Sequence, residues 1–253
     1  MNVTGISAVV TGGASGLGAA TAKALASAGA KVAILDWNIE LAEKTASEIG
    51  VLAIECNVAD EDSAKSAIRT AKEKNGIARV VVNCAGIGGV SRIVGKQGPM
   101  ALSDFEKIIR VNLVGSFNMM RLCATEMITT EPMEGGERGV IISTASIAAY
   151  DGQIGQAAYA ASKGGIVSLT LPAAREFAQF GIRVNAIAPG LFSTPLLEGL
   201  SDEAKQSLSI AIPFPKRLGN ADEYAKLVLH MIENNYINGE VIRIDGALRM
   251  QPK

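Results

Sequence analysis

The chain has 253 residues, of which 48% are apolar and 19% are charged, and its formal net charge is −1. This composition is typical of a folded protein with a buried core, and it excludes an intrinsically disordered chain. A net charge near zero provides no basic field, so neither nucleic acid nor an anionic membrane surface is expected as a partner.

Short apolar runs alternate with helical patterns along the whole chain. The runs that predict buried strands are Ser7–Val10, Lys31–Leu35, Leu52–Asn57, Arg79–Asn83, Val140–Ser143, Arg183–Ile187 and Val241–Ile244. Helical patterns lie between them, at about residues 17–28, 38–48, 61–74, 102–128, 157–179 and 221–233. This alternation predicts a single α/β domain over residues 1–253. We expect a Rossmann-type, doubly wound, seven-stranded parallel sheet with helices on both faces.

Three segments interrupt this alternation: Gly88–Pro99, Thr130–Gly139 and Gly190–Asn220. The last one follows the carboxyl end of a strand, where open α/β sheets bind ligands, so residues 190–220 are predicted to form a substrate lid. The first one contains Arg92 and Lys96, which would attract a phosphate-bearing substrate at the mouth of a cleft. Two loop cations are also typical of plain solvated surface.

The first predicted strand runs into a glycine-rich loop, Thr11–Gly18, which opens the first predicted helix. Glycines let the backbone approach a pyrophosphate, and the helix N-terminus supplies free N–H groups and a positive dipole end. The spacing, G-x-x-x-G-x-G, differs from the G-x-G-x-x-G fingerprint. Its position between strand and helix nevertheless predicts nucleotide binding, with contacts from Gly12, Ser15, Gly16, Leu17 and Gly18.

An acidic residue, Asp36, ends the second predicted strand. A carboxylate there accepts hydrogen bonds from the ribose hydroxyls of an adenosine and repels a 2′-phosphate. No arginine follows Asp36 directly or lies in the glycine loop. The sequence therefore favours NAD over NADP as the cofactor.

Tyr159 and Lys163 are four residues apart, so they share one face if the segment is helical. A free tyrosine, with a pKa of about 10, is a poor base at neutral pH. A nearby ammonium and the positive nicotinamide ring both favour the phenolate. This pair is therefore predicted to carry general acid–base catalysis.

The motifs occur in one order: the glycine loop, Asn83-Cys84-Ala85-Gly86, Asn112, Ser146, Tyr159-x-x-x-Lys163 and Pro189-Gly190. In this order and over essentially the whole chain, they resemble the short-chain dehydrogenase/reductase superfamily. The resemblance implies that Ser146 donates a hydrogen bond to the substrate carbonyl and that Tyr159 transfers the proton. Lys163 would bind the nicotinamide ribose and lower the pKa of Tyr159, and Asn112 would hold a water that links Lys163 to solvent.

The resemblance also implies a set of binding residues. Besides the loop residues and Asp36, the cofactor contacts would be Asn57, Val58, Cys84, Ala85, Gly86, Tyr159, Lys163, Pro189, Gly190 and Thr194. The substrate contacts would be Ser146, Gln153, Tyr159 and Leu191. Asn57 stands where many family members carry aspartate, which weakens its assignment.

Within the superfamily, several stretches are similar to the type 2, short-chain 3-hydroxyacyl-CoA dehydrogenases, among them Gly152–Tyr159, Pro213–Gly219 and Asn238–Pro252. That similarity implies oxidation of 3-hydroxyacyl-CoA thioesters, including the 2-methyl form from isoleucine breakdown, and a homotetramer. Three alternatives remain open: a hydroxysteroid dehydrogenase, an acyl-carrier-protein reductase, and a nucleotide-sensing or scaffold protein without turnover. Asp36 argues against the usual NADPH-linked reductase, and an intact set of Ser146, Tyr159 and Lys163 argues against a protein without turnover.

The sequence also bears on metal sites, disulfides, membrane spans and cellular location. The chain has one histidine and three scattered cysteines, so neither a His/Cys metal site nor a disulfide framework is expected. No apolar run approaches the roughly 20 residues that span a bilayer, and no charged leader precedes the first strand. We expect a cytoplasmic protein, or one of the mitochondrial matrix if the sequence is that of a mature chain.

Overall fold

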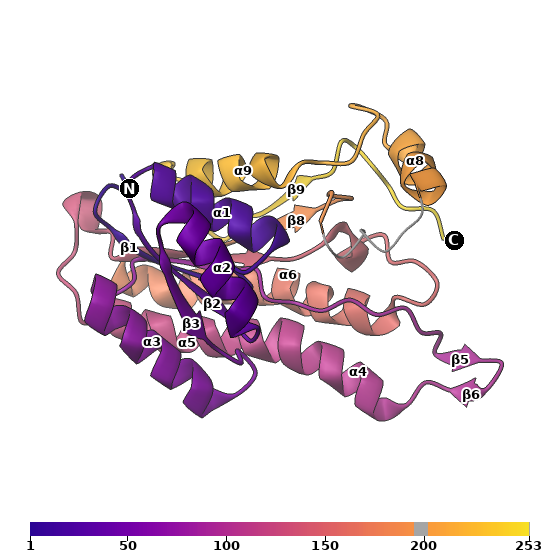
Figure 1. Ribbon diagram of the computed structural model, residues 1–253, viewed down its shortest axis with the longest axis horizontal. Coiled ribbons are helices and arrows are strands. Elements are labelled where there is room, and N and C mark those ends of the chain that lie inside the picture. Colours follow the sequence, from indigo (N-terminus) through magenta and orange to yellow (C-terminus); the bar gives the residue numbers. More distant parts are fainter. Residues whose placement is uncertain (195–201, 253) are drawn as a thin grey trace.

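Seven parallel strands form the central sheet of the computed structural model, which describes residues 1–194 and 202–252 (Figure 1). Their order across the sheet is β3-β2-β1-β4-β7-β8-β9. The strands are β1 (Ser7–Thr11), β2 (Lys31–Asp36), β3 (Leu52–Glu55), β4 (Val80–Asn83), β7 (Gly139–Thr144), β8 (Ile182–Pro189) and β9 (Val241–Ile244). The order reverses between β1 and β4, and this reversal is the point where such sheets bind ligands.

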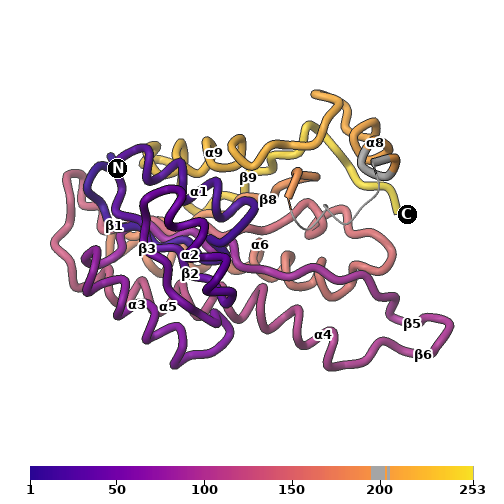
Figure 2. Tube along the Cα trace, in the orientation of Figure 1, coloured from indigo at the N-terminus to yellow at the C-terminus, as the bar shows by residue number. Residues whose placement is uncertain are grey.

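Helices cover both faces of the sheet. They are α1 (Gly16–Ser27), α2 (Ile39–Ile49), α3 (Glu61–Asn75), α4 (Leu102–Ile109), α5 (Gly115–Ile128), α6 (Ala157–Phe177), α8 (Asp202–Ala211) and α9 (Ala221–Glu233). One apolar core joins the sheet to α1, α2 and α9, and a second joins it to α3, α5 and α6. Figures 1 and 2 show these two helix layers above and below the strands. The predicted fold, a single Rossmann-type domain, is confirmed.

Two predicted segments show detail that the sequence did not reveal. The helix expected over 102–128 is present throughout, and its middle is a π-helical turn at Arg110–Val114 between α4 and α5. The segment 190–220, expected to be irregular, contains α8, while residues 195–201 of it lie outside the described residues. In the irregular segment Gly88–Pro99, two short strands, β5 (Val94–Gly95) and β6 (Gly98–Pro99), form a hairpin that projects from the body of the molecule (Figure 1).

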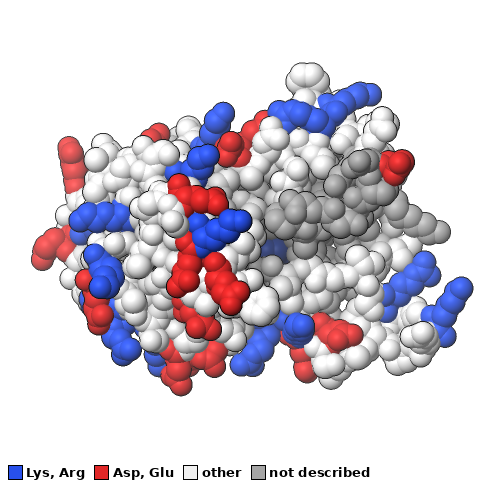
Figure 3. All heavy atoms as spheres, in the orientation of Figure 1, with Lys and Arg blue, Asp and Glu red and all other residues white. Residues whose placement is uncertain are grey.

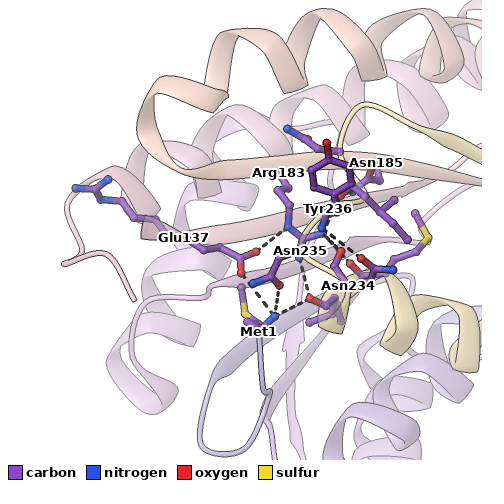
Figure 4. Close-up of polar contacts among 12 residues, drawn as sticks. Met1, Glu137, Arg183, Asn185, Asn234, Asn235 and Tyr236 are labelled. Carbon is purple, nitrogen blue, oxygen red and sulfur yellow. Dashed lines mark hydrogen bonds and ion pairs between the residues drawn. The ribbon is translucent and has the colours of Figure 1, made fainter. Parts of the chain in front are cut away.

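A buried ion pair ties the amino-terminal end of the sheet to α9. The Arg183 guanidinium on β8 donates to the Glu137 carboxylate, 2.8 Å away, and also to backbone carbonyls at the end of α9 (Figure 4). The Met1 ammonium lies 3.6 Å from the same carboxylate. Both charged side chains are 8% exposed, so this is a desolvated contact. It lies at the end of the sheet opposite the carboxyl ends of the strands.

Candidate active site

One large cavity, of about 940 Å³, opens along the carboxyl ends of the strands. Every cofactor residue expected from the sequence lines it: Gly12, Ser15, Gly16, Leu17, Gly18, Asp36, Asn57, Val58, Cys84, Ala85, Gly86, Tyr159, Lys163, Pro189, Gly190 and Thr194. Ser146 and Leu191 line it as well. The sheet therefore gathers residues spread over most of the chain into one site.

The glycine loop fits closely against the rest of the site. Gly12 has φ +63°, and a Cβ on it would lie 2.7 Å from the Ala85 backbone. A Cβ on Gly18 would overlap the Gly12 carbonyl oxygen. Helix α1 then begins at Gly16 with no acidic residue in its first turn, and Ser15 makes no side-chain cap within the described chain. The loop thus leaves helix N–H groups free for an anion, as a pyrophosphate cradle requires.

Asp36 lies at the end of β2, beside this loop. Its carboxylate accepts hydrogen bonds from the backbone N–H groups of Ala14, at 3.1 Å, and Asn38, also at 3.1 Å. These contacts fix the carboxylate on the cavity wall next to the phosphate cradle. A group in this position recognises a vicinal diol and disfavours an added phosphate.

Ser146, Tyr159 and Lys163 lie together at the other end of the cavity. The Ser146 hydroxyl accepts from the Ala148 N–H at 3.1 Å, and its proximity to the Tyr159 hydroxyl lowers the pKa of that tyrosine. Lys163, one helical turn after Tyr159 on α6, has its Nζ atom 5.8 Å from the centre of the tyrosine ring. That ammonium donates to the Thr144 carbonyl oxygen at the end of β7, at 2.6 Å. The strand end and the helix thus hold an acid, a hydroxyl donor and a cation within one small region.

Comparison with known proteins identifies the family. A family model described as short chain dehydrogenase matches residues 7–205. The chain belongs to the short-chain dehydrogenase family. It is 51% identical over 255 residues to 3-hydroxyacyl-CoA dehydrogenase type-2 of Bos taurus, a match that covers 99% of this chain and 98% of that protein.

Two further relatives agree with this assignment. The protein of the same name from Drosophila melanogaster is 49% identical over 248 residues, covering 96% of this chain and 97% of that one. The crystal structure of 3-hydroxyacyl-CoA dehydrogenase type-2 from Mycobacterium avium matches with a TM-score of 0.94 and 46% identity over 98% of each chain. This short-chain dehydrogenase is therefore an oxidoreductase enzyme that resembles these relatives along its length.

Burial shifts the pKa values of both Tyr159 and Lys163. Burial raises the pKa of Tyr159, and the nearby Ser146 hydroxyl lowers it by less. Burial also lowers the pKa of Lys163 from 10.5 to about 8. Burial therefore outweighs the effect of Ser146 on the Tyr159 hydroxyl, and the Lys163 ammonium donates to the Thr144 carbonyl.

Asn112 does not line the cavity and is fully buried in the π-helical turn. Its Oδ1 atom accepts from the Ile87 N–H at 2.8 Å. Its Nδ2 atom donates to the Ile87 carbonyl at 3.0 Å and to the Ser162 hydroxyl at 3.0 Å. The side chain therefore clamps the loop after β4 to helix α6, beside Lys163.

Of the two remaining substrate contacts expected from the sequence, one lines the cavity. Leu191 lines the cavity, but Gln153 is not among the described residues that do; its amide donates to the Gln251 carbonyl at 2.9 Å. Four further lining residues with functional potential were not predicted from the sequence: Trp37, Lys107, Gln156 and Met250. Only Trp37 had a local signal, because it directly follows Asp36.

The described residues also bear on metals and membranes. In residues 1–194 and 202–252, no group of three or more His, Cys, Asp or Glu side chains is arranged to hold a metal ion. Among the same residues, no helix combines the length and the apolar character needed to cross a membrane.

Proposed function

We propose that this enzyme catalyses the NAD-dependent oxidation of 3-hydroxyacyl-CoA thioesters, including 3-hydroxy-2-methylbutyryl-CoA, and the reverse reduction. The observation that carries the proposal is the single cavity that joins Asp36 at one end to Ser146, Tyr159 and Lys163 at the other. The names of the relatives that match the whole chain supply the substrate class. The alternatives are an NAD-dependent hydroxysteroid dehydrogenase and a 3-oxoacyl-carrier-protein reductase.

The cavity suits NAD. The cradle at Gly12 and Gly18 leaves no space for side chains and offers N–H groups to a pyrophosphate. Asp36 offers its carboxylate to a ribose diol. NAD held by these residues would supply the hydride chemistry and, in its oxidised form, a positive charge.

Residues of the chain itself would transfer the proton of the substrate hydroxyl. Ser146 orients the substrate oxygen through its hydroxyl, and Tyr159 takes up or releases the proton of that oxygen. The positive charges of Lys163 and of the oxidised nicotinamide would oppose the burial that raises the pKa of Tyr159. Asn112 fixes the loop and the helix that carry Gly86 and Lys163, so it acts as a positioning residue.

The proposed residue roles lead to a direct test of cofactor and substrate. Turnover of acetoacetyl-CoA, 2-methylacetoacetyl-CoA and a ketosteroid is measured in parallel with NADH and with NADPH. We expect both thioesters to react faster than the steroid, and NADH to be far more efficient than NADPH. Asp36→Ala should narrow the gap between the cofactors, because the repulsion of a 2′-phosphate is removed. Faster turnover of the steroid, or equal use of NADPH, contradicts the proposal.

The assembly belongs to the same proposal, and we infer a homotetramer. Val114 and Phe117, at the junction of the π turn and α5, are 43% and 47% exposed, which is high for large apolar side chains. Light scattering should give four chains per particle, and Phe117→Glu should reduce that number. We further infer that the described parts of the predicted lid, residues 190–194 and 202–220, lie over the substrate. We infer that the enzyme works in the cytoplasm or in the mitochondrial matrix.

A further inference from the structure

The C-terminal segment 245–252 folds back toward the catalytic residues. After β9, Gly246 and Ala247 take φ angles of +59° and +66°, and Ala247 is the one non-glycine with positive φ in the described chain. Such a conformation is costly for alanine and persists only where the surroundings enforce it. Here the Asp245 carboxylate accepts from the Ala247 N–H at 2.9 Å. The chain thereby reverses direction, and Figure 2 shows its yellow end passing beside α8.

Arg243 anchors this reversal. Its guanidinium donates to the Asp245 carboxylate at 2.7 Å, to the Asp151 carboxylate at 2.7 Å and to the Leu248 carbonyl at 3.0 Å. It also stacks on the Tyr150 ring, 5.2 Å from the ring centre. One side chain thus connects β9, the C-terminal segment and the loop that precedes α6.

The end of the segment docks on that same loop. The Pro252 carbonyl accepts from the Ile154 N–H at 3.0 Å, and the Gln251 carbonyl accepts from the Gln153 amide at 2.9 Å. These backbone acceptors hold the segment next to the start of α6, only a few residues before Tyr159. Met250 is the neighbouring residue, and its position is therefore set relative to the reacting centre.

Met250 contributes to an apolar wall at this end of the cavity. It lines the cavity and packs on a small cluster that is separate from the main cores and formed by Ile147, Leu191, Ile212, Leu218 and Leu248. Ile147 directly follows Ser146, so the wall lies at the substrate end and not at the phosphate cradle. An apolar wall fits an alkyl chain, and the flexible thioether of methionine adapts to chains of different shape.

On the basis of the proposed function, we propose that Met250, held by the Arg243 anchor, is a specificity-determining residue that sets the length of alkyl chain accepted beyond the reacting carbonyl. A polar thioester and its long carrier arm gain nothing from an apolar wall, whereas each methylene of an alkyl chain gains by contact with it. Met250 therefore faces the alkyl end of the substrate.

The test compares chain lengths, not absolute rates. We take the ratio of kcat/KM for 3-oxooctanoyl-CoA to that for acetoacetyl-CoA. Met250→Ala should raise this ratio about tenfold, because single methylenes in apolar pockets are discriminated by about 10- to 200-fold. Met250→Phe, which adds volume and stiffness, should lower it. The matched control is Gln251→Ala, since that side chain is exposed and its contact with Gln153 uses the backbone.

Cofactor binding gives a readout that is independent of turnover. Trp37 is the one tryptophan of the sequence and lines the opposite end of the cavity, so its fluorescence should change when NADH binds. Met250→Ala and Met250→Phe should leave the Kd for NADH unchanged, which also establishes that each variant is folded. The inference is overturned if both variants leave the ratio within twofold of the parent, or if Gln251→Ala changes it as much.

A second substrate series separates this inference from the proposed function. Ethyl 3-oxobutanoate and ethyl 3-oxooctanoate present the same two alkyl lengths without a CoA group. If only these esters react, the thioester proposal fails while the shift in their ratio still tests Met250. If neither series reacts, both are overturned. A change in preference for the 2-methyl branch without a change in chain-length preference also overturns the inference.

Discussion

A chain of hydrogen bonds positions the buried ammonium of Lys163. Its ammonium donates to the Thr144 carbonyl, and the Thr144 hydroxyl donates to the Asn83 carbonyl at 2.7 Å. Because that hydroxyl has one hydrogen, the Tyr224 hydroxyl, 2.7 Å away, must donate to it. The Cys84 thiol, 3.8 Å from Tyr224, is then left to donate to the tyrosine oxygen. This directed chain of hydrogen bonds fixes the acceptor of Lys163.

Burying Lys163 lowers the stability of the fold. A pKa lowered from 10.5 to about 8 corresponds to about 3 kcal/mol. We expect Lys163→Met to abolish turnover and to raise the free energy of unfolding by about 1–3 kcal/mol at pH 7, after the lost hydrogen bond is subtracted. Chemical denaturation followed by circular dichroism measures this gain, and the exposed Lys23→Met is the control, with a change near zero.

The stability gained by Lys163→Met should depend on pH. The folded state releases the Lys163 proton near pH 8, whereas the unfolded state holds it up to about pH 10.5. Stability of the parent therefore rises between these values, since the unfolded state binds more protons there. The advantage of Lys163→Met should be constant below pH 8 and shrink from pH 8 to 10.5. An advantage that does not shrink in this window contradicts the assigned burial cost.

Tyr159 is expected to be the proton-transfer group. Tyr159→Phe keeps the packing of the ring and removes the hydroxyl, so NADH binding measured by Trp37 fluorescence should persist. Turnover should fall by about 10²- to 10⁴-fold or more, as for other lost acid–base groups. Tyr150→Phe is the matched control, because Tyr150 is 48% exposed and contacts Arg243 instead of the cavity. If the Tyr159 variant retains most of its activity, a different group transfers the proton.

Among the elements, the β5–β6 hairpin is where the sequence suggested recognition of substrate phosphates. Figure 3 shows Lys and Arg side chains on the face over this hairpin, which carries the exposed Arg92 and Lys96. Neither lines the cavity, so both would act on charge that projects from its mouth. Replacing both with alanine should raise KM for acyl-CoA by about two- to thirtyfold, from roughly 0.2–1 kcal/mol per exposed pair. kcat should be unchanged.

Two control experiments accompany this KM measurement: one varies the salt concentration and the other uses a substrate without phosphate. The KM penalty should shrink as salt is added, because exposed charges are screened over about 10 Å at 0.1 M. Ethyl 3-oxobutanoate, which has no phosphate, should show no penalty. An equal penalty with the ester would mean that the hairpin structure is damaged, and no penalty with either substrate would make Arg92 and Lys96 ordinary surface residues.

An element can be predicted from the sequence when residues close together in the chain form it, and not when it depends on residues far apart in the chain. Buried parallel strands are continuous apolar runs, so their positions follow from the sequence, and the motif residues at their carboxyl ends meet in one cavity as expected. The π turn at Arg110–Val114 has no periodicity signal, because Asn112 bonds to Ile87, 25 residues away. Met250 was missed for the same reason: its place in the cavity depends on a chain reversal fixed by Arg243.

At the scale of the whole molecule, Arg183 joins three separated parts of the chain. It donates to the Glu137 carboxylate before β7, and to the carbonyls of Met231, Ile232 and Ile237 at and after the end of α9, over 2.7–2.9 Å. Figure 4 shows these contacts converging on one guanidinium. A buried ion pair is costly to form, but removing Arg183 would leave the Glu137 carboxylate with only the Met1 ammonium, 3.6 Å away, as its counter-charge. Global stability should therefore depend strongly on this residue.

Arg183→Met should lower the free energy of unfolding by about 3–5 kcal/mol. At about 2–4 °C per kcal/mol for a chain of this size, Tm should fall by roughly 6–20 °C, as measured by circular dichroism. Arg138→Met is the control and should cost less, since Arg138 donates to two backbone carbonyls and pairs with no carboxylate in the described chain. Adding Glu137→Leu to Arg183→Met removes the carboxylate that has lost its guanidinium partner and should restore at least half of the loss, because the Met1 ammonium keeps its hydrogen bonds to the Ile232 carbonyl and the Asn235 side chain. A double variant as unstable as the single one would assign the loss to the stranded α9 carbonyls instead of to the buried charge.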